Sequence, residues 1–351
     1  MEDGLFALYG SYGYTGRLIA RAAVEAGLRP LLCGRDAARL SAQAALLGLE
    51  YCVAPLDDAT ALGDAFSRVR AVLNCAGPIA GTVERVVTAC LRAGVHYLDL
   101  AGEFRVFDRL RARSAIAHRA GIVLMPGVGF DVVPTDCLAL HVARRLPGAT
   151  SLEIAVQGVV GLSRGTALTM LEAAPQGGFV RRGGRLVQVP AAWRTRTVHL
   201  GAGPVPAISV PLADVSSAYY TTGIPSITTY ASGPPSLGLL LRATRLLRPL
   251  LRARWVRRTA DVALRLVETG PGEAARQHAM AHVWAQIADS SGRTATSRLH
   301  APEPYTLTVG TALESVRRVA AGEVPPGFRT PAGAFGPDYV LQFPRVTRED
   351  L

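Results

Sequence analysis

Short apolar segments alternate with amphipathic helical patterns throughout the first 125 residues, and this alternation constrains the fold more than any other feature. The expected strands span 5–9, 30–33, 50–53, 71–75, 95–99 and 122–125. Each is short and rich in Val, Leu or Ile, as is typical of strands buried on both faces of a parallel sheet. The pattern predicts an α/β fold with a doubly wound parallel Rossmann sheet.

Capping residues mark the ends of the expected helices. Asp36 and Asp58 precede two of the helical patterns and are expected as N-caps. Four of the helical patterns stop at glycines, namely Gly27, Gly48, Gly94 and Gly121. The last of these is the helix expected from about 104 to 120, which stops at Gly121.

The first strand runs into a glycine-rich bend, GSYGYTG, where a helix opens at once. Gly10 would allow the tight turn, Gly13 the approach of a pyrophosphate, and Gly16 close packing of helix on strand. The helix N-terminus would offer N–H groups and a partial positive charge to phosphates. A plain strand–turn–helix is the alternative, but the position at the first strand–helix junction favours cofactor binding. The expected cofactor-binding residues here are Gly10, Ser11, Tyr12, Gly13, Tyr14, Thr15 and Gly16.

The end of the second strand bears on the choice of cofactor. An NAD enzyme usually has an acidic residue here, which holds the ribose 2′-hydroxyl. Arg35 lies in this place and could pair with a 2′-phosphate, so NADP is favoured and NAD is the less favoured cofactor. In the alternative, Asp36 serves the ribose and Arg35 is a solvated charge.

Other expected cofactor contacts follow the third and fourth strands, because ligands bind beyond the carboxyl ends of parallel strands. Asp57 would contact the adenine edge or form a turn. The nicotinamide-ribose side would be lined by Asn74, Ala76, Gly77 and Pro78.

Two carboxylates, Asp99 and Glu103, follow the fifth strand at the same edge. They would orient substrate or move protons. A helix cap with a first-turn acid is an equally good interpretation of Glu103.

These motifs resemble the saccharopine dehydrogenase-like oxidoreductases, in particular the branch with the trans-acting enoyl reductases of bacterial lipid and polyketide synthesis. The resemblance extends over nearly the whole chain and is strongest in its first 136 residues. The matching segments are GSYGYTGRL (10–18), CGRD (33–36), VLNCAGPIAG (72–81), ACLRAGVHYLDLAGE (89–103), GVGFDVVPTD (127–136), GLSRGTALTML (161–171), TTGIPSITTY (221–230) and RTPAGAFG (329–336).

The resemblance implies a Rossmann domain, an inserted mixed α/β domain and a nicotinamide cofactor. It also implies cofactor contacts in 127–136, where Phe130 and Asp131 would reach the nicotinamide. A capped start of a helix over about 135–146 is the other interpretation of this segment. The expected domains are 1–130 for the dinucleotide, 131–305 for the substrate, and 306–351 as a helix and irregular tail that packs back on the first domain.

The second domain changes character. Residues 151–160 alternate like a strand, and 186–231 contain short strands separated by Gly and Pro, typical of a mostly antiparallel sheet. Tyr220 in this region is a candidate proton donor, although packing is the commoner role of such a tyrosine. The basic, leucine-rich stretch 236–267 is a packed helix pair, a lid over an apolar substrate, or an interfacial membrane helix.

The composition excludes one reaction mechanism and argues against several kinds of partner and site. All 38 basic residues are arginine, which excludes a lysine Schiff base, and the net charge is +11. The arginines are scattered and no nucleic-acid motif accompanies them, so no nucleic-acid partner is expected. Five cysteines without a CxxC pair favour buried free thiols over a metal site.

No membrane span or signal peptide is expected, so a cytoplasmic location follows, with peripheral membrane contact as an alternative. A homodimer is the expected assembly.

The function hypothesis is hydride transfer between NADP(H) and an organic substrate held between the domains. Reduction of a C=C or C=N bond in a secondary-metabolite, polyketide or lipid intermediate, apolar or carrier-linked, fits best. The candidate catalytic residues are Asp131, Glu103 and Tyr220. The rival hypothesis is a non-catalytic, nucleotide-sensing or membrane-associated scaffold of the same fold.

Overall fold

A computed structural model describes residues 3–158, 168, 176–201, 203–232 and 270–351. The chain forms two compact units, each built from two stretches of sequence. Unit 1 comprises Met1–Phe130 and Tyr305–Ala334, and unit 2 comprises Asp131–Pro304 and Phe335–Leu351.

Unit 1 is built on a seven-stranded, fully parallel sheet in the order β15-β6-β5-β4-β1-β2-β3. The six predicted strands are confirmed, and the order reverses between β1 and β4, where Rossmann sheets bind ligands. The strands are β1 (Asp3–Tyr9), β2 (Arg29–Gly34), β3 (Tyr51–Val53), β4 (Ala71–Asn74), β5 (His96–Asp99), β6 (Val123–Met125) and β15 (Gly327–Phe328).

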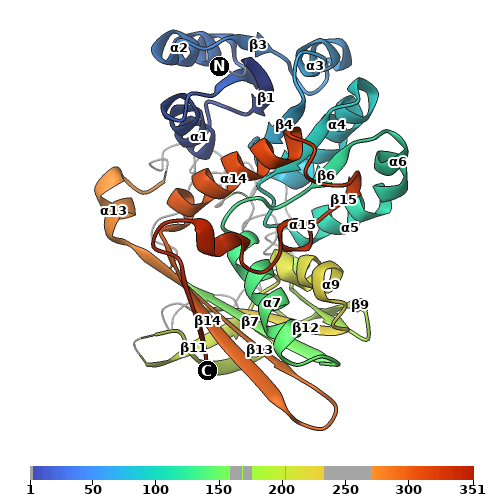
Figure 1. The fold of residues 1–351 in the computed structure, drawn as a ribbon, viewed down its shortest axis with the longest axis vertical. Helices are drawn as coiled ribbons and strands as arrows, with labels where there is room; N and C mark the ends of the chain where they lie inside the picture. Colours follow the sequence, from blue (N-terminus) through green and yellow to red (C-terminus); the bar gives the residue numbers. More distant parts are fainter. Residues whose placement is uncertain (1–2, 159–167, 169–175, 202, 233–269) are drawn as a thin grey trace. The chain divides into compact units, whose positions relative to one another are not determined.

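Helices surround this sheet (Figure 1), and their ends follow the predicted caps. The Asp36 and Asp58 carboxylates accept hydrogen bonds from the N–H groups of Arg39 and Ala61, at 3.1 and 2.9 Å. The helix expected from about 104 to 120 is interrupted at Arg113. The helices are α1 (Tyr14–Glu25), α2 (Ala37–Leu47), α3 (Ala59–Phe66), α4 (Ile79–Ala93), α5 (Phe104–Ala112), α6 (Ser114–Arg119), α14 (Pro304–Ala320) and α15 (Pro331–Phe335).

Unit 2 contains a mixed nine-stranded sheet with a main path β10-β11-β12-β7-β13-β14-β16, and β8–β9 attached to β12. Among the described strands of unit 2, β12 and β7 form a parallel pair, and all the other pairs are antiparallel. The strands are β7 (Ser151–Gln157), β8 (Gly178–Arg182), β9 (Arg185–Val189), β10 (Thr195–His199), β11 (Pro204–Ser209), β12 (Ser226–Ser232), β13 (Met280–Ala288), β14 (Thr294–Pro302) and β16 (Thr347–Asp350).

Helical segments of unit 2 pack on this sheet, and α7 contacts both β13 and β14. The buried side chains of β7, Leu152 and Ile154, alternate with the more exposed Ser151 and Glu153. One face of the sheet is therefore apolar and the other largely polar. The described helical segments are α7 (Val133–Arg145), η2 (Ala213–Val215), α9 (Ser217–Thr222), α13 (Glu273–His278) and η3 (Tyr339–Gln342).

Tyr220 lies in the short helix α9, which follows the turn of η2 and ends at Gly223 in the left-handed conformation. One expectation for the second half of the chain is wrong. The C-terminal tail is not wholly irregular, since its short segments β15 and β16 extend existing sheets. The stretch 236–267 and most of GLSRGTALTML lie outside the described residues.

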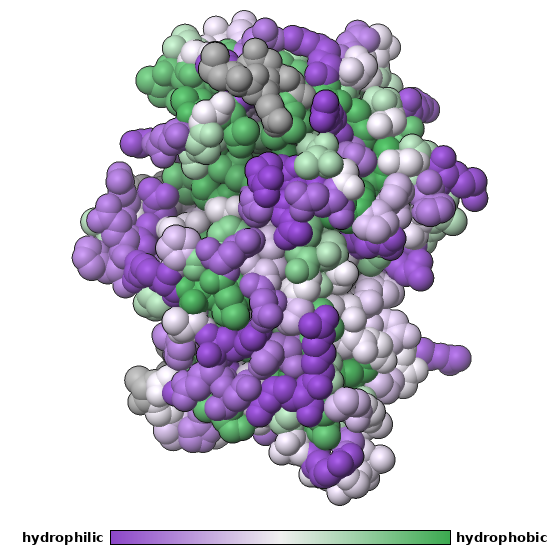
Figure 2. Space-filling model, in the orientation of Figure 1, coloured by the Kyte–Doolittle hydropathy of each residue, from purple (hydrophilic) through white to green (hydrophobic). Residues whose placement is uncertain are grey.

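Hydrophilic side chains gather over β14 and β16 on the face shown in Figure 2. Asp350 contacts His141 and Arg145, and Glu349 pairs with Arg298. Among the described residues, no helix combines the length and the apolar character that crossing a bilayer requires.

Candidate functional site: a dinucleotide site in unit 1

The bend between β1 and α1 is possible only with glycines at its two ends. Gly10 has a φ of +82°, which strongly favours glycine, and a Cβ there would lie 2.7 Å from the N atom of Ala76. A Cβ on Gly16 would lie 2.5 Å from the carbonyl oxygen of Gly10. The bend is thus packed against both its own helix and the loop after β4.

The helix that follows the bend begins at Tyr14 with Gly13 as its N-cap, and no side chain caps it. The first N–H groups of a helix, here those of Tyr14, Thr15 and Gly16, have no acceptor within the helix, and they carry the positive end of the helix dipole. No acidic residue lies in the first turn of α1. This end of the helix therefore suits a phosphate group.

Ser11 is buried, and its side chain points into the protein. Its hydroxyl donates to the Gln43 side chain at 2.9 Å, and the Gln43 amide donates to the Ser11 carbonyl at 3.1 Å. The side chain of Ser11 thus ties the bend to α2, so Ser11 positions the bend from within the protein.

Two arginines lie near the end of β2, close to Tyr12. Arg35 is exposed, and its backbone N–H donates to the Tyr12 hydroxyl at 3.3 Å. The Arg39 guanidinium lies 5.8 Å from the centroid of the Tyr12 ring, and Gly34 leaves room for the ring because its Cβ position would be 2.6 Å from it. Arg35, Arg39 and Tyr12 therefore form one cluster next to the glycine bend.

Asp57 is exposed and lies close to this cluster. Burial raises the pKa of the Tyr9 hydroxyl, the charges of Tyr12 and Asp57 raise it further, and Arg35 lowers it. Tyr9 itself donates to the Ala54 carbonyl at 2.9 Å. The carboxyl ends of β1, β2 and β3 thus bring Arg35 and Asp57 to one edge of the sheet.

Asn74, at the end of β4, uses its side chain to shape the loop that follows. Its amide donates to Thr82 and Tyr97 at 3.0 and 3.2 Å, and its oxygen accepts from the Ala76 N–H at 3.1 Å. Thr82 in turn donates to the Ala76 carbonyl. This arrangement holds Ala76, Gly77 and Pro78 at the sheet edge, with Gly77 exposed.

Asp99 continues this network below the surface. It accepts from the Tyr97 hydroxyl at 2.8 Å and from the N–H groups of Ala101 and Gly127 at 2.8 and 2.9 Å. Burial raises its pKa to about 6, although these three donors each lower it. Asp99 therefore joins the loops after β5 and β6 and does not face solvent.

Glu103 and Phe130 lie on the loops that Asp99 joins. Glu103 is at the N-cap position of α5, and its carboxylate accepts from the N–H of Ala80 in α4 at 3.3 Å. Phe130 is buried, and its N–H donates to Thr308 of α14 at 2.9 Å. Both residues thus support the edge where the strands end.

The other candidate catalytic residues belong to unit 2. Asp131 is its first residue and is exposed. Tyr220 lies in α9, with its ring centroid 5.5 Å from that of Tyr219. Asp131 precedes α7, and Tyr220 lies in α9. These two helices are neighbours, because the Thr221 hydroxyl of α9 donates to the Asp136 carboxylate of α7 at 2.6 Å.

Sequence analysis missed several residues that build this edge. Tyr305 packs edge-to-face on Tyr14 with ring centroids 4.8 Å apart, and the Thr308 hydroxyl accepts a hydrogen bond from the N–H of Phe130. No local pattern links a helix at 304–320 to the first strand. Thr82 and Tyr97 were also missed, because their role depends on contacts with Asn74 across the fold.

No group of three or more metal-ligating side chains occurs in the part of the chain that the structure describes. The five cysteines are all free thiols. Burial raises the pKa of the Cys33, Cys75, Cys90 and Cys137 thiols. These four thiols stay protonated and poorly reactive.

Comparison with known proteins supports the assignment of the site. The family model of the saccharopine dehydrogenase NADP binding domain matches residues 6–125. Trans-acting enoyl reductases of Mycobacterium leprae and Mycobacterium ulcerans are 35% and 30% identical over 150 and 222 residues. These matches cover 40% and 58% of this chain, and 35% and 52% of the two relatives, so the chain spans about half of their length or less.

The fold of the described chain matches a solved structure over almost its full length. Saccharopine dehydrogenase (L-Glu forming) from Saccharomyces cerevisiae has a TM-score of 0.69 and 12% identity, covering 99% of this chain and 100% of that one. At this identity the likeness shows the fold alone. Residues 6–125 thus match the saccharopine dehydrogenase NADP binding domain, and the expected resemblance to the saccharopine dehydrogenase-like oxidoreductases is confirmed.

Proposed function

We propose that this protein is an NADP(H)-dependent oxidoreductase. The observation that carries the proposal is the glycine bend of unit 1, in which the N-terminus of α1 has no acidic residue in its first turn. A pyrophosphate binds such a bend through backbone N–H groups and the helix dipole. The match of residues 6–125 to an NADP-binding domain supports the same cofactor.

The preference for NADP(H) over NAD(H) rests on Arg35. Its exposed guanidinium follows β2, at the position where an NAD enzyme usually has an acidic residue. The Arg39 guanidinium lies over the ring of Tyr12, whose hydroxyl accepts from the backbone N–H of Arg35, so Arg39 is a second candidate partner for a 2′-phosphate. The carboxylate of Asp36 is engaged as the cap of α2, which leaves it less suited to a ribose hydroxyl.

The proposed reaction is reduction of a C=C or C=N bond in a secondary-metabolite, polyketide or lipid intermediate that is apolar or carrier-linked. The enoyl reductase names of the relatives favour the C=C bond. The bound cofactor supplies a hydride, and the protein then has to deliver a proton to the other atom of the bond. Glu103, Asp131 and Tyr220 are the proposed proton carriers, and a homodimer is the proposed assembly.

Replacing Arg35 tests the cofactor preference. In Arg35→Ala, the dissociation constant for NADPH should rise about tenfold or more, because a charge-assisted contact to the 2′-phosphate is lost, while that for NADH should change little. Fluorescence titration of both nucleotides measures this. Arg21→Ala removes another exposed arginine charge, from α1, and should leave both constants unchanged. Equal losses for NADPH and NADH in Arg35→Ala would contradict the assignment.

Turnover distinguishes the enzyme from a nucleotide-sensing scaffold. The purified protein should oxidise NADPH in the presence of enoyl thioesters or cyclic imines, which is followed by the loss of absorbance of the reduced nicotinamide. Tight NADPH binding without turnover across a broad panel of both substrate classes would favour the sensor. Failure to bind either nucleotide at millimolar concentration would overturn both functions.

A further inference from the structure

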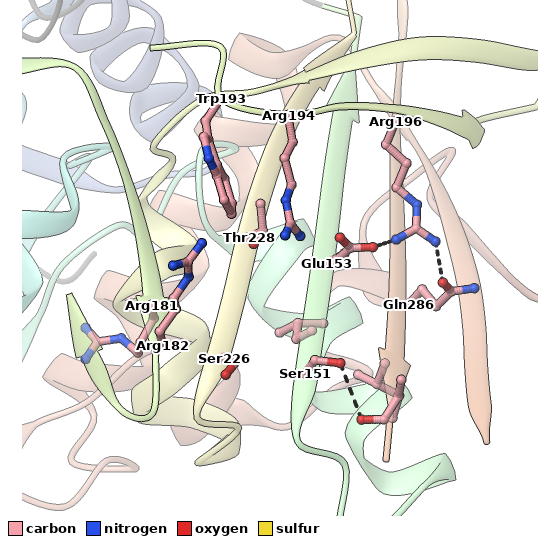
Figure 3. Close-up of a pocket in the computed structure, with 13 residues that line it drawn as sticks. Ser151, Glu153, Arg181, Arg182, Trp193, Arg194, Arg196, Ser226, Thr228 and Gln286 are labelled. Atoms are coloured by element: carbon pink, nitrogen blue, oxygen red, sulfur yellow. Dashed lines mark hydrogen bonds and ion pairs between the residues drawn. The ribbon is translucent and has the colours of Figure 1, made fainter. Parts of the chain in front are cut away.

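A cavity of about 480 Å³ lies in unit 2, on the polar face of its sheet. It is lined by side chains from β7, β8, β10, β12 and β13 and from the segment before β10 (Figure 3). The lining includes four arginines, Arg181, Arg182, Arg194 and Arg196, and one carboxylate, Glu153. Nothing in the proposed dinucleotide site uses these residues, since they belong to the other unit.

Two of the arginines stack on the same indole. The guanidinium carbons of Arg182 and Arg194 lie 4.6 and 4.1 Å from the Trp193 ring centroid. Stacking engages the flat face of a guanidinium and leaves its N–H edge available for hydrogen bonds. The Arg194 guanidinium also interacts with the Tyr230 hydroxyl. Neither guanidinium pairs with a carboxylate among the described residues, so the positive charge of both remains available to an anion.

The other two arginines are already engaged. Arg181 is buried, donates to the carbonyl oxygens of Val215 and Gly184, and lies over the Tyr219 ring at 4.2 Å. Arg196 pairs with Glu153 and contacts Gln286, as the dashed lines in Figure 3 show. The one carboxylate in the lining is therefore neutralised, and the charge of Arg182 and Arg194 is not.

Hydroxyl groups complete the lining. Ser226 and Thr228 lie on β12 at alternate positions, so both side chains point to the face that carries the arginines. They are half-buried and lie in the same cavity as the two stacked guanidinium groups. Hydroxyl and guanidinium donors together suit a tetrahedral oxyanion of charge near −2, and guanidinium forks match phosphate in particular.

We propose that this cavity is a binding site for the phosphoryl group of a phosphomonoester, held by Arg182 and Arg194 on Trp193 and by the hydroxyls of Ser226 and Thr228. The volume admits a small molecule but not a nucleic-acid duplex. The site is independent of the proposed oxidoreductase activity. Inorganic phosphate and an organic phosphomonoester present the same chemistry, and the test below separates them.

Isothermal titration calorimetry on the full chain tests this site. Saturating NAD⁺, which carries no phosphomonoester group, is present throughout so that added phosphate does not compete for the dinucleotide site. Inorganic phosphate and glycerol 3-phosphate are titrated separately at constant ionic strength, with acetate as the monovalent control. The wild type should bind one equivalent of a phosphate ligand and bind acetate far more weakly. Tighter binding of glycerol 3-phosphate than of phosphate would identify an organic ligand, and the reverse order would identify the free ion.

Exposed arginines supply matched variants. Arg182→Gln and Arg194→Gln should each weaken phosphate binding about tenfold, because each removes a charge-assisted contact. Arg185→Gln removes the same charge from the strand after Arg182, outside the cavity lining, and should leave binding unchanged. All three arginines are exposed, and circular dichroism checks that the variants fold. Absence of phosphate binding in the wild type, or equal weakening in all three variants, would overturn the proposal.

Discussion

Asp214 and Asp136 place two carboxyl groups in the interior of unit 2, with no exposed surface on either. Asp136 accepts from Thr221, and Asp214 accepts from Ser217 at 3.4 Å, while the second oxygen of Asp214 has no hydrogen-bond partner in the described structure. Burial, together with the charge of Asp136, raises the pKa of Asp214 to about 8. Asp214 is therefore mostly protonated at neutral pH.

This pKa predicts a pH dependence of stability. Between about 4, the pKa of an unfolded Asp, and about 8, the folded chain binds more protons than the unfolded chain. The contribution of Asp214 is fully present below pH 4, falls as pH rises, and is lost above about 8. Asp214→Asn removes this titration, so its free energy of unfolding, relative to that of the wild type, should increase from pH 5 to pH 8 by a few kcal/mol.

Urea denaturation at several pH values measures this difference. Asp64→Asn changes an exposed aspartate on α3 and should show no such trend relative to the wild type. A constant difference between Asp214→Asn and the wild type across this range would show that the carboxyl group is ionised in the folded state.

The roles of some residues could be predicted from the sequence, and the roles of others could not. The caps Asp36 and Asp58 were predicted because a cap acts within three residues of chain. The Ser11 side chain points into the protein because its hydroxyl donates to Gln43. The orientation of the Asn74 side chain is fixed in part by its hydrogen bond to Tyr97. Such contacts between distant positions leave no periodic pattern in one sequence.

At the level of elements, the helix α14 packs in unit 1 and stabilises its loops, although it lies far from them in sequence. Thr308 accepts the N–H of Phe130, and the methyl and hydroxyl of Thr308 lie against Gly129, within about 3.1 Å of where a Cβ would stand. This contact fixes the loop after β6 against a helix more than 170 residues away in sequence.

Removing the hydroxyl of Thr308 should loosen this loop. Thr308→Val keeps the shape but leaves the buried N–H of Phe130 without its acceptor, which costs about 1–3 kcal/mol. Thr308→Ser keeps the acceptor and should cost less. Denaturant unfolding gives the stabilities, and NADPH titration shows whether the loop matters for binding. A larger loss in the serine variant than in the valine variant would contradict this role of the hydrogen bond.

Elements with long periodic patterns were predicted well and short ones were not. The six strands of the first 125 residues emerged because each is an uninterrupted apolar run between helices. The strand β15 has only Gly327 and Phe328, which is too short for any period. The helix α9, which carries Tyr220, has only six residues and is likewise too short to show a helical period.

In the whole molecule, unit 1 consists of two separate stretches of chain, and Asp131–Pro304 of unit 2 lies between them in sequence. Strand β15 pairs with β6, and Ser114 of α6 accepts the N–H of Phe328 at 3.0 Å. Sequence analysis gave the location of the dinucleotide domain but not its last strand, since pairing at an edge of the sheet depends on the complete fold.

This division predicts a pattern of protection by the cofactor. Saturating NADP⁺ stabilises the unit that binds it, and cooperative units exchange their amide hydrogens together. Hydrogen exchange followed by mass spectrometry should therefore show slower exchange in Tyr305–Ala334 as well as in the first 130 residues. Protection confined to the glycine bend and its neighbours would contradict cooperation between the two stretches.

The return of 305–334 to the first sheet also affects the order of events during synthesis. A ribosome adds about 5–20 residues per second, and domains at the start of a chain usually fold first. Here the nascent nucleotide-binding sheet lacks its edge strand until Phe328 has emerged from the ribosome. For a time on the order of tens of seconds, the backbone of β6 offers an unpaired edge to any other strand, which is the period when chaperones would be most needed.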